Sequence, residues 1–594
     1  MSPRLRSRRI RLAVAPSAGP STPGGRRSDL LLPLRPAAAG IALALLASTH
    51  APPANAAPVD GRHLAAQIEG FLAASYPADE PGAAVIATRD GQVVYRGAHG
   101  MADLELGVPL EPDMVFRLGS ITKQFTAAAI LLLEEQGKLS LDDPITKLLP
   151  DYPTHGHEIT IRHLLSHTSG IRSYTGIPGW MQTKIKQDMT LDELIDGFDS
   201  EPMDFAPGER FLYNNSGYVL LGMIIEKASG KGYEEYIEQE IFQPLEMKAS
   251  DYGDHGRIIP RRAKGYDGGP GSYRNAQYLS MTQPHAAGSL LSTVDDLAKW
   301  DAALYTQDLL SKASLEKQVT PFTLNDGTST GYAYGLSVGE LRGRPSISHG
   351  GGIFGFSTYA LRLPEERVYV AVLSNDSGKP VRPSYVAQKV AAMVIGDPFP
   401  ERVAVDRPAA DLEQYTGVYR IDDEETRTVL LVGERLVTER TGGDRQPLEA
   451  AGGDLFFYPG SFTHLTFERD ENGEISHMLL YPNGAPEPER AERTDEPLPQ
   501  GPERAEVDPA IYDRYVGVYE LQPGFDLTVT RDGDALFVQA TGQSRLELMP
   551  TSETEFHVAA IGATLRFVVG DGGGPAQAAI LLQGGREMEA ARKD

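Results

Sequence analysis

The sequence of 594 residues contains no cysteine. This absence excludes disulfide bonds, thiolate metal ligands, a cysteine nucleophile and a lipid-modified cysteine anchor. Basic residues are also scarce, because 56 Lys and Arg stand against 81 Asp and Glu, for a formal net charge of −25. So acidic a chain is repelled by a phosphate backbone, which argues against nucleic acid as a partner.

Long apolar runs are missing as well. The run Ala37–Ser48 has 12 residues, too few to span a bilayer. Eight arginines and one acidic residue precede it, and an A-x-A pattern follows at Ala54–Ala56. This layout is typical of a cleavable export signal. We therefore expect residues 1–56 to be removed, which leaves an exported bacterial protein, periplasmic or secreted, with a net charge of about −32. The pairs Arg8-Arg9 and Arg26-Arg27 keep the twin-arginine route open beside the general one.

Strand patterns occur near both ends of residues 57–400. The stretch "GAAVIATRDGQVVYRGAHG" predicts a hairpin turning at Asp90-Gly91, and "YAYGLSVGEL", "SISHGGGIFGFSTYALRL" and "VYVAVLSN" predict strands further on. The sequence between them is mostly helical and rich in loops. Helices inserted between strands that share one sheet predict an α+β domain with an antiparallel sheet and flanking helices.

The remaining chain is duplicated. "YTGVY" at Tyr415–Tyr419 recurs 100 residues later as "YVGVY" at Tyr515–Tyr519. We predict two small antiparallel β-barrels, at 408–492 and 510–594, joined by a polar linker at 493–509. Their aromatic residues belong either to the cores or to a ligand site inside the barrels.

One short stretch carries the first chemical signal. In "FRLGSITKQFTAAAILLLEEQG", Ser120 precedes Lys123 by three residues at the head of an apolar helix. Positions three apart share a helical face, so the lysine can reach the hydroxyl. Ser120 is then either an activated nucleophile or an ordinary helix cap. A second S-x-x-K, at Ser314–Lys317, stands in a polar helix that offers nothing to bury the lysine.

Acyl transfer also needs a proton shuttle and donors for an oxyanion. Tyr-x-Asn patterns begin at Tyr213, Tyr273 and Tyr481, and the first leads directly into a buried-type helix. His-x-Gly occurs once, at His349–Gly351, inside "SISHGGGIFGF". Glycines after a strand allow a substrate backbone to lie against it.

Four histidines lie close together in sequence, at positions 155, 157, 163 and 167. His163 and His167 have the i, i+4 spacing of zinc ligands. The glutamate of H-E-x-x-H is missing, so a buried structural role is the competing interpretation.

The ordered set "GSITKQFTA", "LLSHTSGI", "YNNSGYVLLG", "GSLLSTVDDLAKW" and "HGGGIFGF" resembles the class C β-lactamase-like serine hydrolases over about residues 60–396. That group includes class C β-lactamases, DD-peptidases, D-aminopeptidases and esterases. The resemblance implies a β-lactamase and penicillin-binding-protein fold. It also implies lipocalin-like barrels behind the catalytic domain, as in D-aminopeptidase.

The resemblance also implies roles for individual residues. Ser120 is the nucleophile, Lys123 its partner, and Tyr213 the general base, as a phenolate stabilised by Lys123. His349 completes the catalytic set. The backbone N–H groups of Ser120 and Gly352 form the oxyanion hole. The residues implied to contact substrate are Asn215, Gly350 and Gly351. No metal and no cofactor are implied.

Histidine at position 349 departs from the lysine of class C β-lactamases and favours the peptidase and esterase branches. We therefore expect an exported serine hydrolase that forms an acyl-enzyme on D-amino-acid-containing peptides, amides or small esters, peptidoglycan fragments included. The alternatives are a β-lactamase or DD-carboxypeptidase, and a penicillin or peptidoglycan sensor without turnover. The sequence leaves the oligomeric state and the role of the barrels open.

Overall fold

The structure, a computed structural model, describes residues 61–378, 381–499, 501–522, 525–541, 543, 545–570, 573–584 and 586–593. The expected export signal lies outside the described residues. Within these ranges, no helix combines the length and the apolarity needed to cross a membrane.

The first part of the chain is built on a six-stranded antiparallel sheet with the strand order β10-β11-β12-β13-β1-β2. The strands are β1 (Ala83–Arg89), β2 (Gln92–His99), β10 (Ser337–Leu341), β11 (Arg344–Ile353), β12 (Phe356–Leu363) and β13 (Val368–Ser374). The predicted turn joins β1 to β2, and Asp90 and Gly91 have φ values of 52° and 73°. Positive φ at both central residues suits a tight hairpin.

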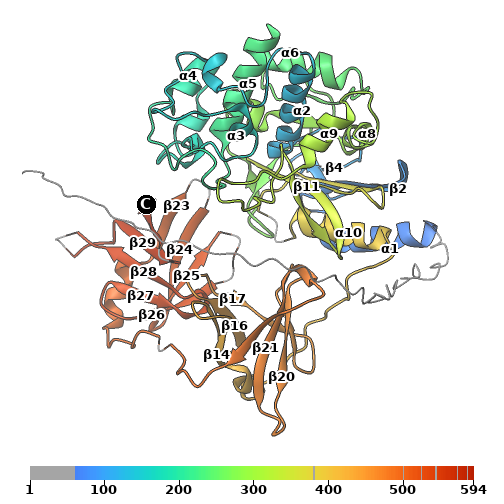
Figure 1. Cartoon of the computed structure of the whole chain (residues 1–594). Helices are drawn as coiled ribbons and strands as arrows, with labels where there is room; N and C mark the ends of the chain where they lie inside the picture. Colours follow the sequence, from blue (N-terminus) through green and yellow to red (C-terminus); the bar gives the residue numbers. More distant parts are fainter. Residues whose placement is uncertain are drawn as a thin grey trace, which may run out of the picture. The chain divides into compact units, whose positions relative to one another are not determined.

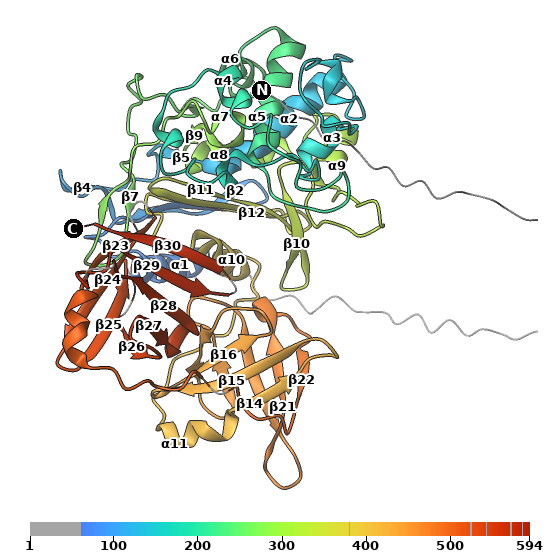
Figure 2. The same ribbon diagram turned by 90° about the vertical axis from the view of Figure 1, so that its left-hand side faces the viewer.

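Helices cover both faces of this sheet (Figures 1 and 2). On one face, α1 (Gly61–Ser75) and α10 (Pro383–Val394) bury apolar side chains against β12, β13 and β1. On the other face lies a larger helical group that contains α2 (Thr122–Glu135), α5 (Asn215–Ser229) and α8 (Val294–Ala303). The α+β prediction is confirmed, and the sheet separates two apolar cores.

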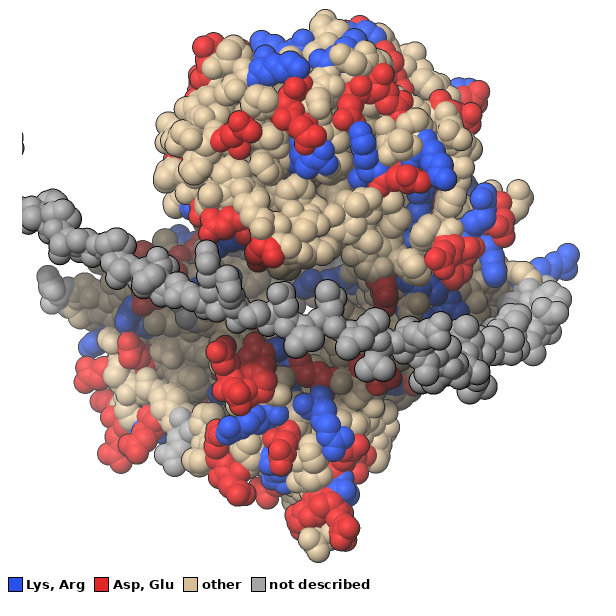
Figure 3. Space-filling model, viewed as in Figure 1, with Lys and Arg blue, Asp and Glu red and all other residues tan. Residues whose placement is uncertain are grey.

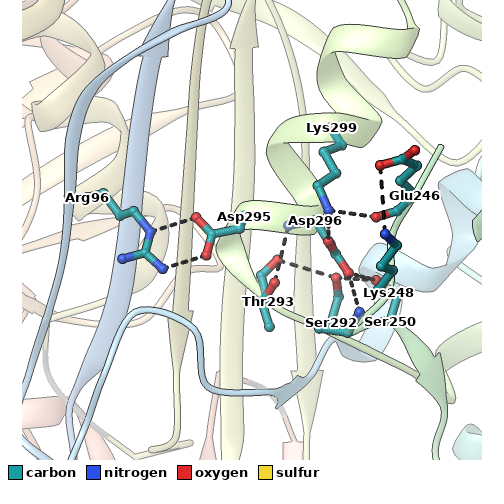
Figure 4. Close-up of polar contacts among 10 residues, drawn as sticks. Arg96, Glu246, Lys248, Ser250, Ser292, Thr293, Asp295, Asp296 and Lys299 are labelled. Carbon is teal, nitrogen blue, oxygen red and sulfur yellow. Dashed lines mark hydrogen bonds and ion pairs between the residues drawn. The ribbon is translucent and has the colours of Figure 1, made fainter.

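Helix α8 is fixed by polar contacts at its first turn (Figure 4). The Thr293 side chain caps the helix by accepting a hydrogen bond from the N–H of Asp296. Asp295 forms an ion pair of 2.7 Å with Arg96 on β2. The buried Asp296 carboxylate pairs with Lys299 at 2.7 Å. Carboxylates near a helix N-terminus are stabilised by its dipole. The stretch "GSLLSTVDDLAKW" therefore serves to anchor helix α8.

The rest of the described chain forms two antiparallel β-structures, as predicted. The first is a nine-stranded sheet of β14 (Gly417–Arg420), β15 (Thr426–Val432), β16 (Arg435–Arg440), β17 (Gln446–Pro447), β18 (Glu449–Ala450), β19 (Leu455–Phe457), β20 (His464–Arg469), β21 (Ile475–Tyr481) and β22 (Glu489–Arg493). The second is a closed barrel of β23 (Gly517–Gln522), β24 (Phe525–Asp532), β25 (Ala535–Ala540), β26 (Arg545–Pro550), β27 (Glu555–Val558), β28 (Ala563–Val568), β29 (Ala578–Gln583) and β30 (Arg586–Arg592).

The two copies differ at one position of the strand that completes each barrel. Pro447 pairs with Val437 at the position where Glu547 pairs with Phe537 in the second copy. Proline has no N–H to donate to a strand ladder. Only Leu448 separates β17 from β18, and its N–H donates to the carbonyl of Leu436 at 2.9 Å, so the first copy is a nearly closed barrel. In the second copy, β26 is continuous and pairs with both neighbours.

The repeated tyrosines belong to the cores. The Tyr419 hydroxyl donates to the carbonyl of Tyr415 at 2.7 Å, and Tyr519 donates to Tyr515 at 2.8 Å. None of the four side chains is more than 1% exposed. Of the two roles left open for them, they fill the core.

The molecular surface carries mixed charge. On the face drawn in Figure 3, basic side chains lie next to acidic ones. Ion pairs such as Arg172–Asp204 at 2.6 Å and Arg469–Asp454 at 2.7 Å give the same pattern.

Candidate active site

Ser120 lies on a tight turn between β5 (Phe116–Arg117) and α2, within the 3-10 turn η1 (Gly119–Ile121). Gly119 has φ of 55°, the left-handed region that glycine reaches without strain. Neither η1 nor α2 has a side-chain cap. Ser120 therefore does not serve as a helix cap, and its hydroxyl is free for other contacts.

Lys123 is the centre of the polar contacts. Its side chain is fully buried, at 0% exposure. The Nζ atom lies 3.2 Å from Ser120 Oγ, 2.9 Å from Asn215 Oδ1 and 2.8 Å from the carbonyl oxygen of Ala287. Burial lowers the pKa of Lys123 well below its ordinary value of 10.5. In the described chain no carboxylate pairs with it, so no ion pair offsets this shift towards the neutral amine.

Tyr213 lies beside this pair, just before α5. The Lys123 Nζ atom is 4.8 Å from the centre of its ring. Tyr213 is 37% exposed overall, yet desolvation raises the pKa of its phenol above 10, and the hydrogen bond with Ser120 opposes this only in part. The resting phenol is thus protonated, whereas the expected phenolate scheme requires its pKa to fall.

His349 lies on β11 and is held by two hydrogen bonds. Its Nδ1 lies 2.6 Å from the carbonyl oxygen of Gly350, so this nitrogen carries the proton. Its Nε2 is 2.9 Å from the hydroxyl of Tyr332, which donates to it. Burial, followed by the nearby Lys123, lowers the pKa of His349 to about 3. The imidazole is therefore neutral and of fixed tautomer.

The glycines after His349 bring β11 against the Ser120 turn. A Cβ on Gly351 would overlap the carbonyl oxygen of Leu118 and the hydroxyl of Thr358, whereas one on Gly352 would meet nothing within 4 Å. A Cβ on Gly119 would lie 3.0 Å from the nitrogen of Gly352. The backbone of Gly352 thus lies against the turn that carries Ser120.

The edge of β11 is open beside the site. Pairing with β10 ends at Ser337 and Ser348, while pairing with β12 continues from Gly350 to Ile353. An extended peptide can add to such a free edge by backbone hydrogen bonds.

His167 lies behind Tyr213, with ring centres 4.3 Å apart. Its Nδ1 accepts a hydrogen bond from the N–H of Asn214 at 3.1 Å. His163 caps the helix α3 (Ile161–Leu165) by accepting from the N–H of Thr160. Among the residues that the structure describes, no group of three potential ligands surrounds a metal position. These two histidines have structural contacts.

The other sequence candidates lie apart from these contacts. The Tyr273 hydroxyl donates to Glu80 at 2.8 Å, and Tyr481 stacks on His464 with ring centres 4.6 Å apart. The N–H of Ser314 donates to the cap Ser311, and Lys317 pairs with Glu134 at 2.8 Å. Within the described chain, Ser120, Lys123 and Asn215 come together, with Tyr213 and His349 alongside.

Two contributors to the site are not predicted from the sequence. Tyr332 stands in "GYAYGL", which matches no motif, and the acceptor on Ala287 is a backbone carbonyl. A buried tyrosine needs a hydrogen-bond partner, but the sequence does not identify that partner.

Comparison with known proteins places this site in a family. Residues 71–393 match the family described as Beta-lactamase. Residues 401–495 and 502–588 each match the same domain of unknown function, DUF3471. Penicillin-binding protein 4* of Bacillus subtilis is 30% identical over 530 residues, or 86% of this chain and 94% of that protein.

Two further relatives cover less of the chain. The D-aminopeptidase of Gluconobacter oxydans is 29% identical over 58% of this chain and 65% of its own length. The octameric penicillin-binding protein homologue from Pyrococcus abyssi is 29% identical and superimposes with a TM-score of 0.52, over 71% of this chain and 98% of that one. With its fold, its Ser120–Lys123 pair and these relatives in view, the chain belongs to the Beta-lactamase family and is a serine hydrolase of the penicillin-binding-protein type.

Proposed function

We propose that this protein hydrolyses D-amino-acid-containing peptides or amides, or small esters, through an acyl-enzyme on Ser120. The observation that carries the proposal is the environment of Lys123 Nζ. Two of its contacts are to neutral oxygen acceptors, on Asn215 and Ala287, and the third is to Ser120. A neutral amine that donates its two hydrogens to those acceptors directs its lone pair at the Ser120 hydroxyl.

The reaction begins with attack by the Ser120 hydroxyl. Ser120 Oγ bonds to the substrate carbonyl carbon while its proton passes to Lys123, and the carbonyl oxygen becomes an oxyanion facing the N–H groups of Ser120 and Gly352. Collapse expels the amine or alcohol, which takes a proton from the Tyr213 hydroxyl, and Lys123 returns a proton to Tyr213. Water repeats these steps, frees the acid and restores Ser120.

This scheme changes the order of proton transfer that the family resemblance implies. Lys123 is the first proton acceptor because burial favours its neutral form, while Tyr213 begins as a phenol. Asn215 holds Lys123 and can also face the acyl group. Gly350 and Gly351 allow the substrate backbone to approach β11.

Covalent labelling tests the nucleophile. A fluorophosphonate probe should add once, and mass spectrometry should find it on the peptide that contains Ser120. Ser120→Ala should abolish labelling, and Ser314→Ala, the matched S-x-x-K control, should not. Labelling of Ser314, or of neither serine, would reject the proposal.

A substrate panel separates the alternatives. D-amino-acid p-nitroanilides, p-nitrophenyl esters and nitrocefin should be compared at equal enzyme concentration. The proposal expects turnover of amides or esters. Stoichiometric acylation by penicillin without turnover of any substrate would instead support the sensor, and preferred nitrocefin hydrolysis would support a β-lactamase.

We further propose that residues 1–56 direct export and that the chain divides at about residue 400. The basic, apolar and A-x-A segments support the first part. The second is supported by the matched regions, which end at 393 and resume at 401. N-terminal sequencing of the processed protein should begin at Ala57, and limited proteolysis should cut between 397 and 408. A lipocalin-like role for the barrels rests on their architecture alone.

A further inference from the structure

A cavity lies next to the segments that carry Ser120 and Gly352. It has a volume of about 380 Å³. Its wall includes Arg117, His255, Arg262, Lys264, Tyr278 and Phe356. Arg117 precedes Ser120 by three residues on β5, and Phe356 opens β12 opposite Ile353. A cavity of this size is in the range of small-molecule sites.

Arg117 is a half-buried cation without a counter-ion. Its guanidinium carbon lies 5.7 Å from the centre of the Phe356 ring. Over the described ranges, its side chain has no ion pair and no hydrogen bond. Burial, and then the positive charge of Arg262, lower the pKa of Arg117 to about 10. The charge that affects it most is thus another cation, an arrangement that costs free energy unless an anion offsets it.

The neighbouring charges do not supply that anion. Arg262 is exposed, and its hydrogen bond goes to the backbone carbonyl of Asp254 at 3.4 Å. Lys264 is paired with Glu105, which also accepts from Asn275. The Asp188 carboxylate accepts from Ser280 at 2.6 Å and from Tyr278 at 3.4 Å. The cavity therefore retains two positive charges, those of Arg117 and Arg262.

Aromatic side chains form part of the remaining wall. Tyr278 stacks on His255 with ring centres 4.8 Å apart, and Phe356 packs edge-on against Phe116 at 6.3 Å. Aromatic faces favour flat or apolar groups, and arginine binds carboxylates with two parallel hydrogen bonds. We propose that this cavity binds a carboxylate carried on an apolar group, with Arg117 and Arg262 as its counter-charges.

This site differs from the position of His349, whose neutral imidazole offers no positive charge to a substrate carboxylate. The inference does not require Ser120 to be acylated, because binding is measured directly. Two sources of the same chemistry remain: a carboxylate at the far end of the substrate acyl group, and a free carboxylic acid that acts as an effector.

Calorimetric titration with benzoate at fixed ionic strength tests the site, with benzamide as the uncharged control. We expect benzoate to bind at least tenfold more tightly than benzamide. Arg117→Gln should weaken benzoate binding at least tenfold, Arg262→Gln by a smaller factor, and Arg117→Lys should retain part of the affinity. Arg435→Gln, an exposed arginine of the first barrel, is the matched control and should have no effect.

Protein capped on Ser120 by the fluorophosphonate should still bind benzoate, which distinguishes this cavity from the hydrolase site. Circular dichroism confirms that each variant folds. Equal affinities for benzoate and benzamide, unchanged binding in Arg117→Gln, or loss of binding on capping would each overturn the proposal.

Activity then separates the two sources. If the carboxylate belongs to the acyl group, a glutaryl p-nitroanilide should show a KM about tenfold below that of its pentanoyl analogue in the wild type only. If the site takes a free acid, benzoate should change turnover of a neutral substrate, and the two p-nitroanilides should have similar KM values.

Discussion

The Tyr332 hydroxyl donates a hydrogen bond of 2.9 Å to Nε2 of His349. The second nitrogen, Nδ1, faces the carbonyl of Gly350 at 2.6 Å. Together these contacts leave one possible tautomer for a neutral imidazole. Tyr332 is therefore a positioning residue that acts through His349.

Replacement of Tyr332 by phenylalanine should free Nε2. We expect kcat/KM to fall about tenfold, because an unfixed imidazole loses orientation next to the nucleophile. The specific readout is a long-range ¹H–¹⁵N spectrum of histidine at pH 7. The wild type should show His349 protonated on Nδ1 alone, and the variant a mixture. An unchanged tautomer in Tyr332→Phe would contradict this role.

Lys123 and Tyr213 should behave as one unit. Lys123→Ala and Tyr213→Phe should each lower kcat by roughly 10²–10⁴, since each breaks the same proton path. The double variant should be little worse than the poorer single variant. Additive losses would show that the two residues act independently. Lys317→Ala is the matched control and should retain wild-type kcat.

The low pKa of His349 makes the fold sensitive to acid. Its pKa is about 3 in the folded protein and about 6.5 when unfolded, so between these values only the unfolded chain binds the proton. Its contribution to the free energy of unfolding is complete above pH 6.5 and is lost as the pH falls towards 3. At pH 5 the loss amounts to about 2 kcal/mol.

Melting temperatures at pH 7.5 and pH 5.0 test this linkage. His349→Gln removes the titrating group, so its Tm should fall less between the two pH values than that of the wild type. The pH dependence of wild-type activity should also show no ionisation near pH 6.5. Equal Tm losses in both proteins would refute the buried neutral state.

The neutral His349 also bears on substrate choice. It provides no fixed positive charge for a carboxylate at this end of the site, unlike a lysine. We expect neutral amides or esters to exceed nitrocefin by roughly 10²-fold in kcat/KM, about 2.7 kcal/mol. His349→Lys should narrow the gap, chiefly through a lower KM for nitrocefin. Faster wild-type turnover of nitrocefin than of every neutral substrate would reverse this interpretation.

Gly351 and Gly352 form a matched pair for a steric test. A methyl group at position 351 would overlap Leu118 and Thr358, and one at 352 would enter open space. Gly351→Ala should therefore cost about 1–3 kcal/mol of stability, as overpacking does, and should separate β11 from the Ser120 turn. Gly352→Ala should keep its Tm near that of the wild type. Equal Tm values for the two variants would show that β11 does not pack as described.

The site residues could be predicted from the sequence where local spacing or an ordered set of motifs identifies them. Ser120 and Lys123 are one helical turn apart, so their contact follows from helix geometry. Tyr213 and His349 are far from them in sequence, and only the resemblance connected them.

Other features depend on how deeply a side chain is buried and on contacts with backbone atoms, and neither can be read from a sequence. The pKa of Tyr213 rises because burial outweighs its neighbours, and the Ala287 carbonyl has no side-chain signature. The predicted strand "YAYGLSVGEL" begins only at Ser337. Gly335, with φ of 72°, turns the chain there, and a Cβ on it would lie 2.6 Å from the carbonyl oxygen of Lys123.

The contacts of the Lys123 amine also have a meaning for the chain before it folds. Its partners Asn215 and Ala287 are 92 and 164 residues away in sequence, and both meet it inside a closed core. In an extended chain this lysine is hydrated and protonated like any other, and Ser120 is an ordinary alcohol. Nucleophilic reactivity is thus a property that the chain acquires only when its core closes. An unfolded chain should not react with a serine-directed label, so such a label reports on completed folding.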